Sequence, residues 1–170
     1  MGKLRSPWKM RTSYLIAAFL VLMFWMFHQE AEAETRVELS AGATYVGGNR
    51  YDSEALMLTD RSSDGKYEVG ILLQLRLDCA NGADCRRGEA ERPNQALIIK
   101  RVVHRGNFEM SFGMSYWHNE SPAWDSHTPF VLGMGYRFFD DFFINYTHFS
   151  TGGSSANNGG LDFISLGYSF

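Results

Sequence analysis

Large apolar residues recur at every second position along most of the chain after about residue 34. From Phe108 to Tyr116 they alternate with Glu, Ser and Gly, and similar alternation returns further along the chain, for example after Phe130. A period of two predicts β-strands with one apolar and one polar face, whereas a helix would show a period near 3.6. Following the alternation predicts eight strands, at 36–46, 52–60, 66–77, 95–104, 107–117, 129–138, 142–150 and 160–170.

The chemistry of these strands favours a membrane-spanning barrel over a soluble sandwich, although alternation alone fits both. The strands are about 9–11 residues long, which is the length that a tilted strand needs to cross a bilayer. Their polar faces, which would line the interior, carry Glu, Arg and Gln, such as Arg76 in strand 66–77, and a soluble core would bury these residues at a cost. Trp117 and Trp124 are interpreted as belt residues at the membrane interface. We therefore predict an all-β fold, an eight-stranded antiparallel transmembrane β-barrel whose interior is filled by side chains.

The connections between the predicted strands support this topology. Those near 47–51, 78–94, 118–128 and 151–159 are mostly long, whereas those near 61–65, 105–106 and 139–141 are short. Outer-membrane barrels have long outer loops and short periplasmic turns. The last strand ends on the aromatic Phe170, which resembles the assembly signal of such barrels. We expect a multi-pass barrel in a bacterial outer membrane.

The first 33 residues have the composition of a secretory signal peptide. Four basic residues precede an uncharged run from Tyr14 to Phe27, and the small-residue site Ala31-Glu32-Ala33 follows. The run is about 14 residues long, whereas a transmembrane helix needs roughly 20. An uncleaved anchor is the alternative. We expect a signal peptide over 1–33 and the barrel over 34–170.

Charge and cysteine content narrow the expected partners. Residues 34–170 contain 12 Lys and Arg against 17 Asp and Glu, a net charge of −5, and no basic cluster indicates nucleic acid. Cys79 and Cys85 lie in DCANGADC, which in an exported protein favours one local disulfide. Two cysteines without nearby histidines lack the four ligands of a structural zinc site. No metal or other cofactor is predicted.

Three polar residues fall on faces that are otherwise apolar. The outward row of strand 142–150 ends with His148 and Ser150, and the outward row of strand 160–170 begins with Asp162. Because the two strands are joined by the 151–159 loop and should pair antiparallel, all three side chains are expected outside the barrel at the same end.

Serine, histidine and an acid together have the chemistry of a hydrolase. Serine becomes a nucleophile when a base removes its proton, histidine takes and returns that proton, and the acid orients the imidazole. Residues two apart on a strand share a face, with Cα atoms about 6.6–6.8 Å apart, so Ser150 is within reach of His148. Polar residues are also ordinary near lipid headgroups, so a structural role stays open on these residues alone.

The stretch HFSTGGSSANNGGLD resembles the PagL family of outer-membrane lipid A 3-O-deacylases. The motif of that family is His-x-Ser-Asn, a Gly-containing loop and Asn-x-Gly-x-Glu. The matching positions here are His148, Ser150, Gly153, Asn158, Gly160 and Asp162, without a gap. Two positions depart from the motif: Asp162 stands where the family has Glu, and Thr151 where it has Asn.

The resemblance implies a role for each residue of the site. Ser150 would be the nucleophile, His148 the general base and Asp162 the orienting acid. The backbone N–H of Gly153 and the side chain of Asn158 would be the oxyanion donors. The implied substrate is lipid A within lipopolysaccharide, embedded with the protein in outer-membrane lipid, and the reaction removes an ester-linked 3-hydroxyacyl chain.

Two other functions stay open from the sequence. One is a barrel without catalysis, acting as an adhesin, a binding module or a structural protein. The other is a palmitoyltransferase-like barrel, which would carry an amphipathic helix before its first strand, where only Glu34 and Thr35 are present here. The sequence also leaves both a monomer and a homodimer open.

Overall fold

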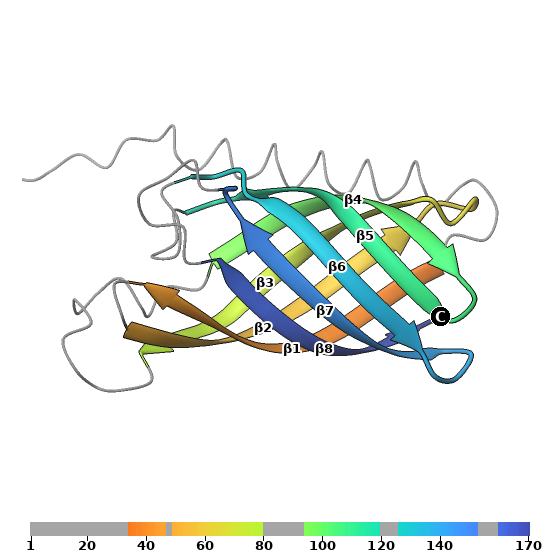
Figure 1. The fold of residues 1–170 in the computed structure, drawn as a ribbon, viewed down its shortest axis with the longest axis horizontal. Coiled ribbons are helices and arrows are strands. Elements are labelled where there is room, and N and C mark those ends of the chain that lie inside the picture. The colour runs from red at the N-terminus through yellow and green to blue at the C-terminus, as the bar shows by residue number, and fades with distance from the viewer. Residues whose placement is uncertain (1–33, 47–48, 80–93, 120–125, 153–159) are drawn as a thin grey trace, which may run out of the picture. The chain divides into compact units, whose positions relative to one another are not determined.

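The chain forms a closed antiparallel barrel of eight strands in a computed structural model, which describes residues 34–46, 49–79, 94–119, 126–152 and 160–170 (Figure 1). The strands are β1 (Glu34–Val46), β2 (Asn49–Arg61), β3 (Tyr67–Cys79), β4 (Asn94–Arg105), β5 (Phe108–Trp117), β6 (Phe130–Arg137), β7 (Phe142–Ser150) and β8 (Leu161–Ser169). Each pairs with its sequence neighbours, and β8 pairs with β1 to close the barrel. The all-β class, the barrel and its eight strands are confirmed, and each predicted strand end lies within three residues of the observed one.

Several sequence predictions lie outside the described residues. They concern the signal peptide at 1–33, Cys85 of the expected disulfide, Trp124, and the loop residues Gly153 and Asn158. Within the described ranges, no helix is long and apolar enough to cross a membrane.

The two ends of the barrel differ in their connections. The short turns 62–66, 106–107 and 138–141 lie at one end together with Phe170, and we call this the turn end (Figure 1). The ends of β7 and β8 near Ser150 and Leu161 lie at the opposite end, which we call the loop end. In the turn after β2, hydrogen bonds from the Ser62 hydroxyl, and then from Lys66, lower the pKa of Asp64 to about 2.

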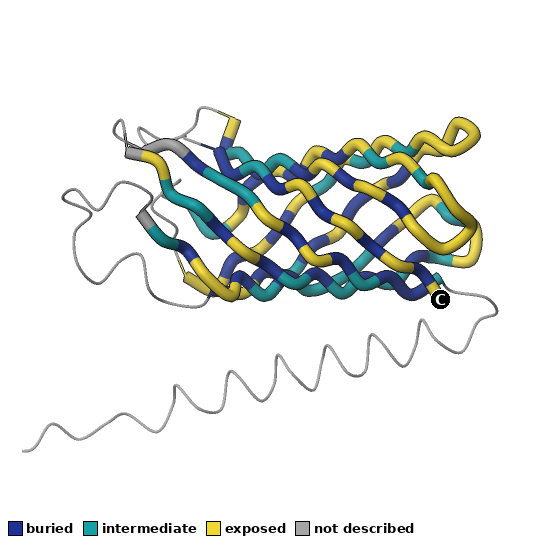
Figure 2. The backbone as a smooth tube through the Cα atoms, turned by 90° about the horizontal axis from the view of Figure 1, so that it is seen from below, coloured by how far each residue is buried: buried dark blue, intermediate teal, exposed yellow. Residues whose placement is uncertain are grey.

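Burial alternates along the strands as their composition requires (Figure 2). The interior contains an apolar cluster of Ala55, Met57, Leu72, Ala96, Ile98, Trp117, Val131, Phe149, Leu161 and Phe163. Aromatic rings meet edge to face within it: Phe149 packs on Trp117 with ring centroids 5.4 Å apart and on Phe163 at 6.0 Å. These rings pack against the inner face of β7 and β8 near the loop end.

Trp117 corrects one sequence interpretation. Its side chain is 0 % exposed inside the barrel, where the indole N–H donates to Ser115 Oγ at 3.1 Å, so it is not a belt residue. The alternation along β5 explains the position. Because Phe112, Met114 and Tyr116 point outward, the next residue must point inward.

Arg76 also departs from the predicted pattern. The register between β2 and β3 shifts after Glu54, which pairs with Arg76, while Ala55 pairs with Gln74. Leu75 is therefore an extra residue, a β-bulge that reverses the alternation beyond it. As a result Arg76 is 59 % exposed on the outside instead of facing the interior, and Leu77 is buried.

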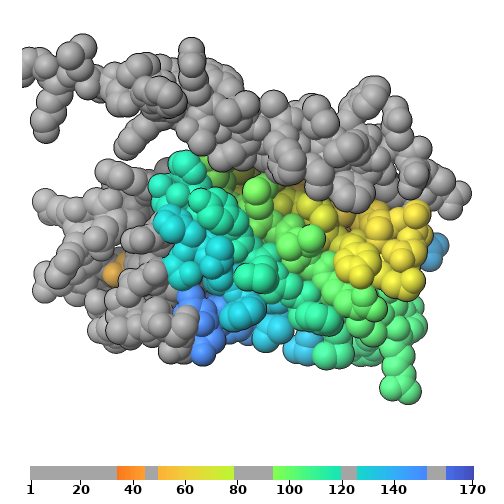
Figure 3. Space-filling view, turned by 90° about the horizontal axis from the view of Figure 1, so that it is seen from above, coloured from red at the N-terminus to blue at the C-terminus, as the bar shows by residue number. Residues whose placement is uncertain are grey.

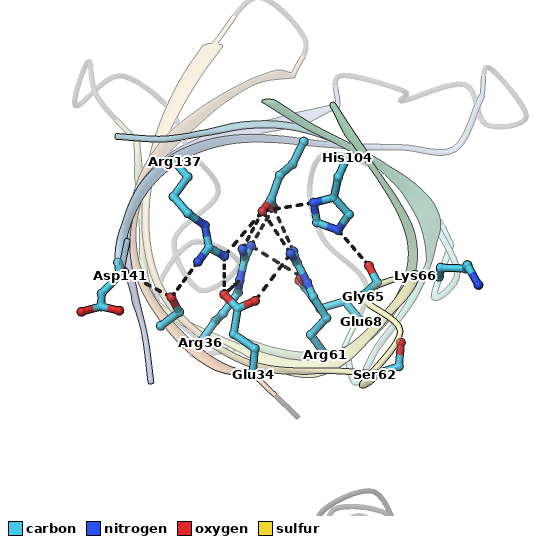
Figure 4. Close-up of polar contacts among 12 residues, drawn as sticks. Glu34, Arg36, Arg61, Ser62, Gly65, Lys66, Glu68, His104, Arg137 and Asp141 are labelled. Carbon is cyan, nitrogen blue, oxygen red and sulfur yellow. Dashed lines mark hydrogen bonds and ion pairs between the residues drawn. The ribbon is translucent and has the colours of Figure 1, made fainter. Parts of the chain in front are cut away.

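The interior at the turn end is filled by ion pairs (Figure 4). Glu109 accepts two hydrogen bonds from Arg36, at 2.8 and 2.9 Å, and two from Arg61, at 2.9 and 3.0 Å. Glu68 pairs with Arg61 at 2.8 Å and with Lys100 at 2.6 Å. Paired in this way, these inward charges compensate one another.

The outer wall of the barrel is mostly apolar. One face, formed by side chains of β4, β5 and β6, is seen in Figure 3. Exposed side chains on these and neighbouring strands include Ile99, Met110, Phe112, Met114, Phe130, Leu132, Met134, Ile144, Ile164 and Leu166. A soluble monomer rarely exposes so large a continuous apolar surface.

Candidate active site

Strand pairing brings the predicted site residues together outside the barrel. His148 on β7 pairs directly with Asp162 on β8. The neighbouring residues Thr147, Phe149, Leu161 and Phe163 are buried, so His148 and Asp162 point outward. Ser150, two residues after His148 and the last residue of β7, lies on the same face.

His148 and Asp162 are hydrogen bonded through Nδ1 and Oδ1, which are 2.7 Å apart. An ionised carboxylate only accepts hydrogen bonds, so the Nδ1–H donates and the imidazole is held in that tautomer. Nε2 is then the nitrogen that can accept a proton. This is the arrangement that a general base needs, with a carboxylate behind it to stabilise the imidazolium.

A third residue, which sequence analysis did not identify, joins this pair. The Tyr146 hydroxyl donates a hydrogen bond to Asp162 Oδ1, the oxygen that also accepts from His148. Tyr146 lies two residues before His148 on the same outward row and pairs with Ile164. In the sequence, Tyr146 resembles the other outward-facing aromatic residues. Only the register of β7 against β8, which places it near Asp162, distinguishes it from them.

Gly160 fixes the position of the imidazole from the side of the loop. Its φ of +64° is in the left-handed region, and its carbonyl accepts a hydrogen bond from the buried Thr44 hydroxyl. A Cβ added to Gly160 would lie 2.7 Å from His148 Cε1. The ring therefore lies against the backbone at a point where only glycine leaves room.

The turn after β7 sets the position of the Ser150 hydroxyl. The backbone N–H of Gly152 donates to Ser150 Oγ at 3.2 Å, and Gly152 has a φ of +65°. Thr151, between them, is buried. The side chain at this departure from the family motif is therefore turned away from the outward site.

The residues paired with the site are apolar, large on the β6 side and small on the β1 side. On β6, the exposed side chains of Phe130 and Leu132 stand opposite Ser150 and His148. On the other side, Asp162 pairs with the small Ala43 of β1. Within the described ranges, no three His, Cys, Asp or Glu side chains come together in a way that could hold a metal ion.

Comparison with known proteins does not indicate a function, which is therefore inferred from the geometry of the site. No protein-family model matches the chain, and no curated protein matches it closely enough to indicate a relative. Three side chains that sequence analysis had selected, His148, Ser150 and Asp162, share one outward face at the loop end, and two of them are hydrogen bonded.

Proposed function

We propose that this protein is an outer-membrane serine esterase that removes the ester-linked 3-hydroxyacyl chain at the 3-position of lipid A. The observation that carries the proposal is the 2.7 Å hydrogen bond between His148 and Asp162 on the outside of the barrel, beside Ser150. A polar, hydrogen-bonded pair on a wall that exposes mostly apolar side chains is costly in lipid and indicates function.

The outer wall supports a membrane location. Its exposed residues are mostly large and apolar, with Phe138, Phe139, Phe142, Tyr168 and Phe170 gathered at the turn end, as in an aromatic belt. The interior is filled by side chains, which favours a membrane-anchored enzyme over a pore. A bilayer substrate such as lipid A could reach the outward site laterally, without leaving the membrane.

The proposed reaction gives each side chain of the site one role. His148 Nε2 takes the proton of Ser150 Oγ, which attacks the ester carbonyl, while Nδ1–H remains bonded to Asp162. The tetrahedral intermediate collapses when His148 returns the proton to the departing 3-oxygen of the sugar. Water, activated by the same imidazole, then releases the 3-hydroxy fatty acid from Ser150. Gly153 and Asn158, by the family resemblance, would stabilise the oxyanion.

Mass spectrometry of lipid A tests the proposal. Lipid A is prepared from cells that produce the wild-type protein or Ser150→Ala, and we expect loss of one 3-hydroxyacyl chain with wild type only. Replacing the nucleophile of a triad lowers the activity roughly 10³-fold or more. Heat-modifiable gel migration of both proteins checks that they fold equally.

The opposite result has a clear meaning. Unchanged lipid A in cells and with the purified, folded wild-type protein in detergent would contradict the esterase. It would favour a barrel that binds or stabilises without catalysis. Equal deacylation by wild type and Ser150→Ala would place the activity elsewhere.

A further inference from the structure

The outward carboxylate of Asp162, on β8, accepts hydrogen bonds from two residues of β7. Tyr146 Oη and His148 Nδ1 both donate to Oδ1. The Asp162 side chain is 48 % exposed to the outside. Ala43 opposite Asp162, Leu132 opposite His148 and Ile164 opposite Tyr146 are apolar and offer no side-chain donor. The Tyr146 hydroxyl is therefore the second side-chain donor that the carboxylate has at this place on the wall.

An aspartate held by a single hydrogen bond can rotate about its last side-chain bond. The rotation would move its charge away from the imidazole and weaken its stabilisation of the imidazolium, an attraction that a low-dielectric setting makes strong. A second donor on the same oxygen removes this freedom, because both bonds are made in only one orientation. Charge-assisted hydrogen bonds of this kind are about twice as strong as neutral ones.

We propose that Tyr146 is a positioning residue for the esterase: its hydroxyl holds the Asp162 carboxylate in the orientation that fixes the His148 imidazole. This inference rests on the proposed function. Tyr146 acts through Asp162 and does not touch the reacting atoms. Its ring stays on the outward row with Ile144, and only its hydroxyl has the positioning role.

Kinetics with Tyr146→Phe test the role. The substrate is purified lipid A in detergent micelles, and the readouts are kcat and KM. We expect kcat to fall roughly tenfold, the loss typical of a hydrogen bond to a charged group, with KM changed less than about twofold. Tyr136→Phe is the matched control. Tyr136 is also outward and 38 % exposed, like Tyr146, but its ring packs on Phe108 toward the turn end.

A double-mutant cycle separates positioning from direct substrate contact. In an Asp162→Asn background, whose residual rate is measured first, adding Tyr146→Phe should lower the rate no further, because the carboxylate that it positions is gone. A full tenfold loss in that background would overturn the inference, since Tyr146 would then act without Asp162. An unchanged kcat in the single variant would overturn it as well.

A spectroscopic measurement keeps the inference separate from the proposed function. In micelles, the Nδ1–H proton of ¹⁵N-labelled His148 is assigned by its loss in His148→Gln and observed by NMR. Tyr146→Phe should speed its exchange with water about tenfold, whereas Tyr136→Phe should leave it unchanged. Unaltered exchange in Tyr146→Phe overturns the positioning role even if Ser150→Ala has shown the esterase to be real. If exchange is altered but no deacylation is found, Tyr146 still positions Asp162 and His148 through these hydrogen bonds, but the protein is not the proposed esterase.

Discussion

At the scale of single residues, the Asp162 carboxylate is the group on which the site depends. It links Tyr146 and His148 through one oxygen. Asp162→Asn keeps the shape of the side chain, but an amide in place of the carboxylate no longer stabilises the imidazolium and allows the wrong tautomer. We expect kcat to fall by about 10²–10⁴-fold with normal folding, measured on lipid A in detergent micelles. A variant that retains wild-type kcat would remove Asp162 from the mechanism.

Gly160 gives a second residue-scale prediction with a close control. In Gly160→Ala the new Cβ would meet His148 Cε1 at 2.7 Å and displace the ring. A displacement of this size costs about 10²-fold in rate. Gly106→Ala has the same backbone problem, a φ of +61°, but nothing within 4 Å of the added Cβ. Both variants should lose about 1–3 kcal/mol of stability, and only Gly160→Ala should lose activity. Equal activities would show that the ring is free to move.

At the scale of elements, the rings inside the barrel support the two strands that carry the site. Trp117 on β5 packs against Phe149 on β7, which lies between His148 and Ser150 in sequence. Trp117→Ala would leave a cavity there and lower the free energy of unfolding by about 3–5 kcal/mol. Urea unfolding in lipid vesicles measures the loss. It is monitored by circular dichroism of the backbone, since the tryptophan fluorescence changes with the substitution. A loss below about 1 kcal/mol would contradict the support that we assign to this ring.

The strands themselves were predictable because alternation reports directly on the facing of a β-strand. It gave the outward positions of His148, Ser150 and Asp162, and pairing of β7 with β8 then required the last to lie near the others. Alternation does not report a bulge, so Arg76 was assigned to the wrong face. Trp117 was misassigned because aromatic character was given more weight than its position in the alternation.

The hydrogen bond from Tyr146 could not be predicted for a different reason. It depends on the exact stagger between β7 and β8, which sets Tyr146 opposite Ile164, two residues along β8 from Asp162. A shift of the pairing would have separated the hydroxyl from the carboxylate. The contact between Gly160 and His148 likewise depends on the backbone conformation of Gly160, which side-chain pattern does not reveal.

At the scale of the whole molecule, the charges inside the barrel balance. In the part of the chain that the structure describes, four basic and four acidic residues face one another there, namely Arg36, Arg61, Lys100 and Arg137 with Glu34, Glu38, Glu68 and Glu109. Lys100→Met would leave an excess buried negative charge, and we expect a loss of about 3–5 kcal/mol in the free energy of unfolding. Lys66→Met is the control. It breaks an ion pair with Asp64 whose side chains are about half exposed, and should change stability little.

The outer wall allows a test of the membrane location that does not depend on catalysis. Met110 lies on the outward row of β5 and pairs with Met134, with apolar Phe112 two residues further along the same row. If this wall faces hydrocarbon, Met110→Arg should lower the free energy of unfolding in phospholipid vesicles by about 2–4 kcal/mol, since a charge in the apolar band must be desolvated. Asn107→Arg, in the exposed turn between β4 and β5, should have little effect. If the wall faces water instead, the arginine at 110 would be tolerated as well as the one at 107, and the barrel would have to bury its exposed apolar rows against another protein surface.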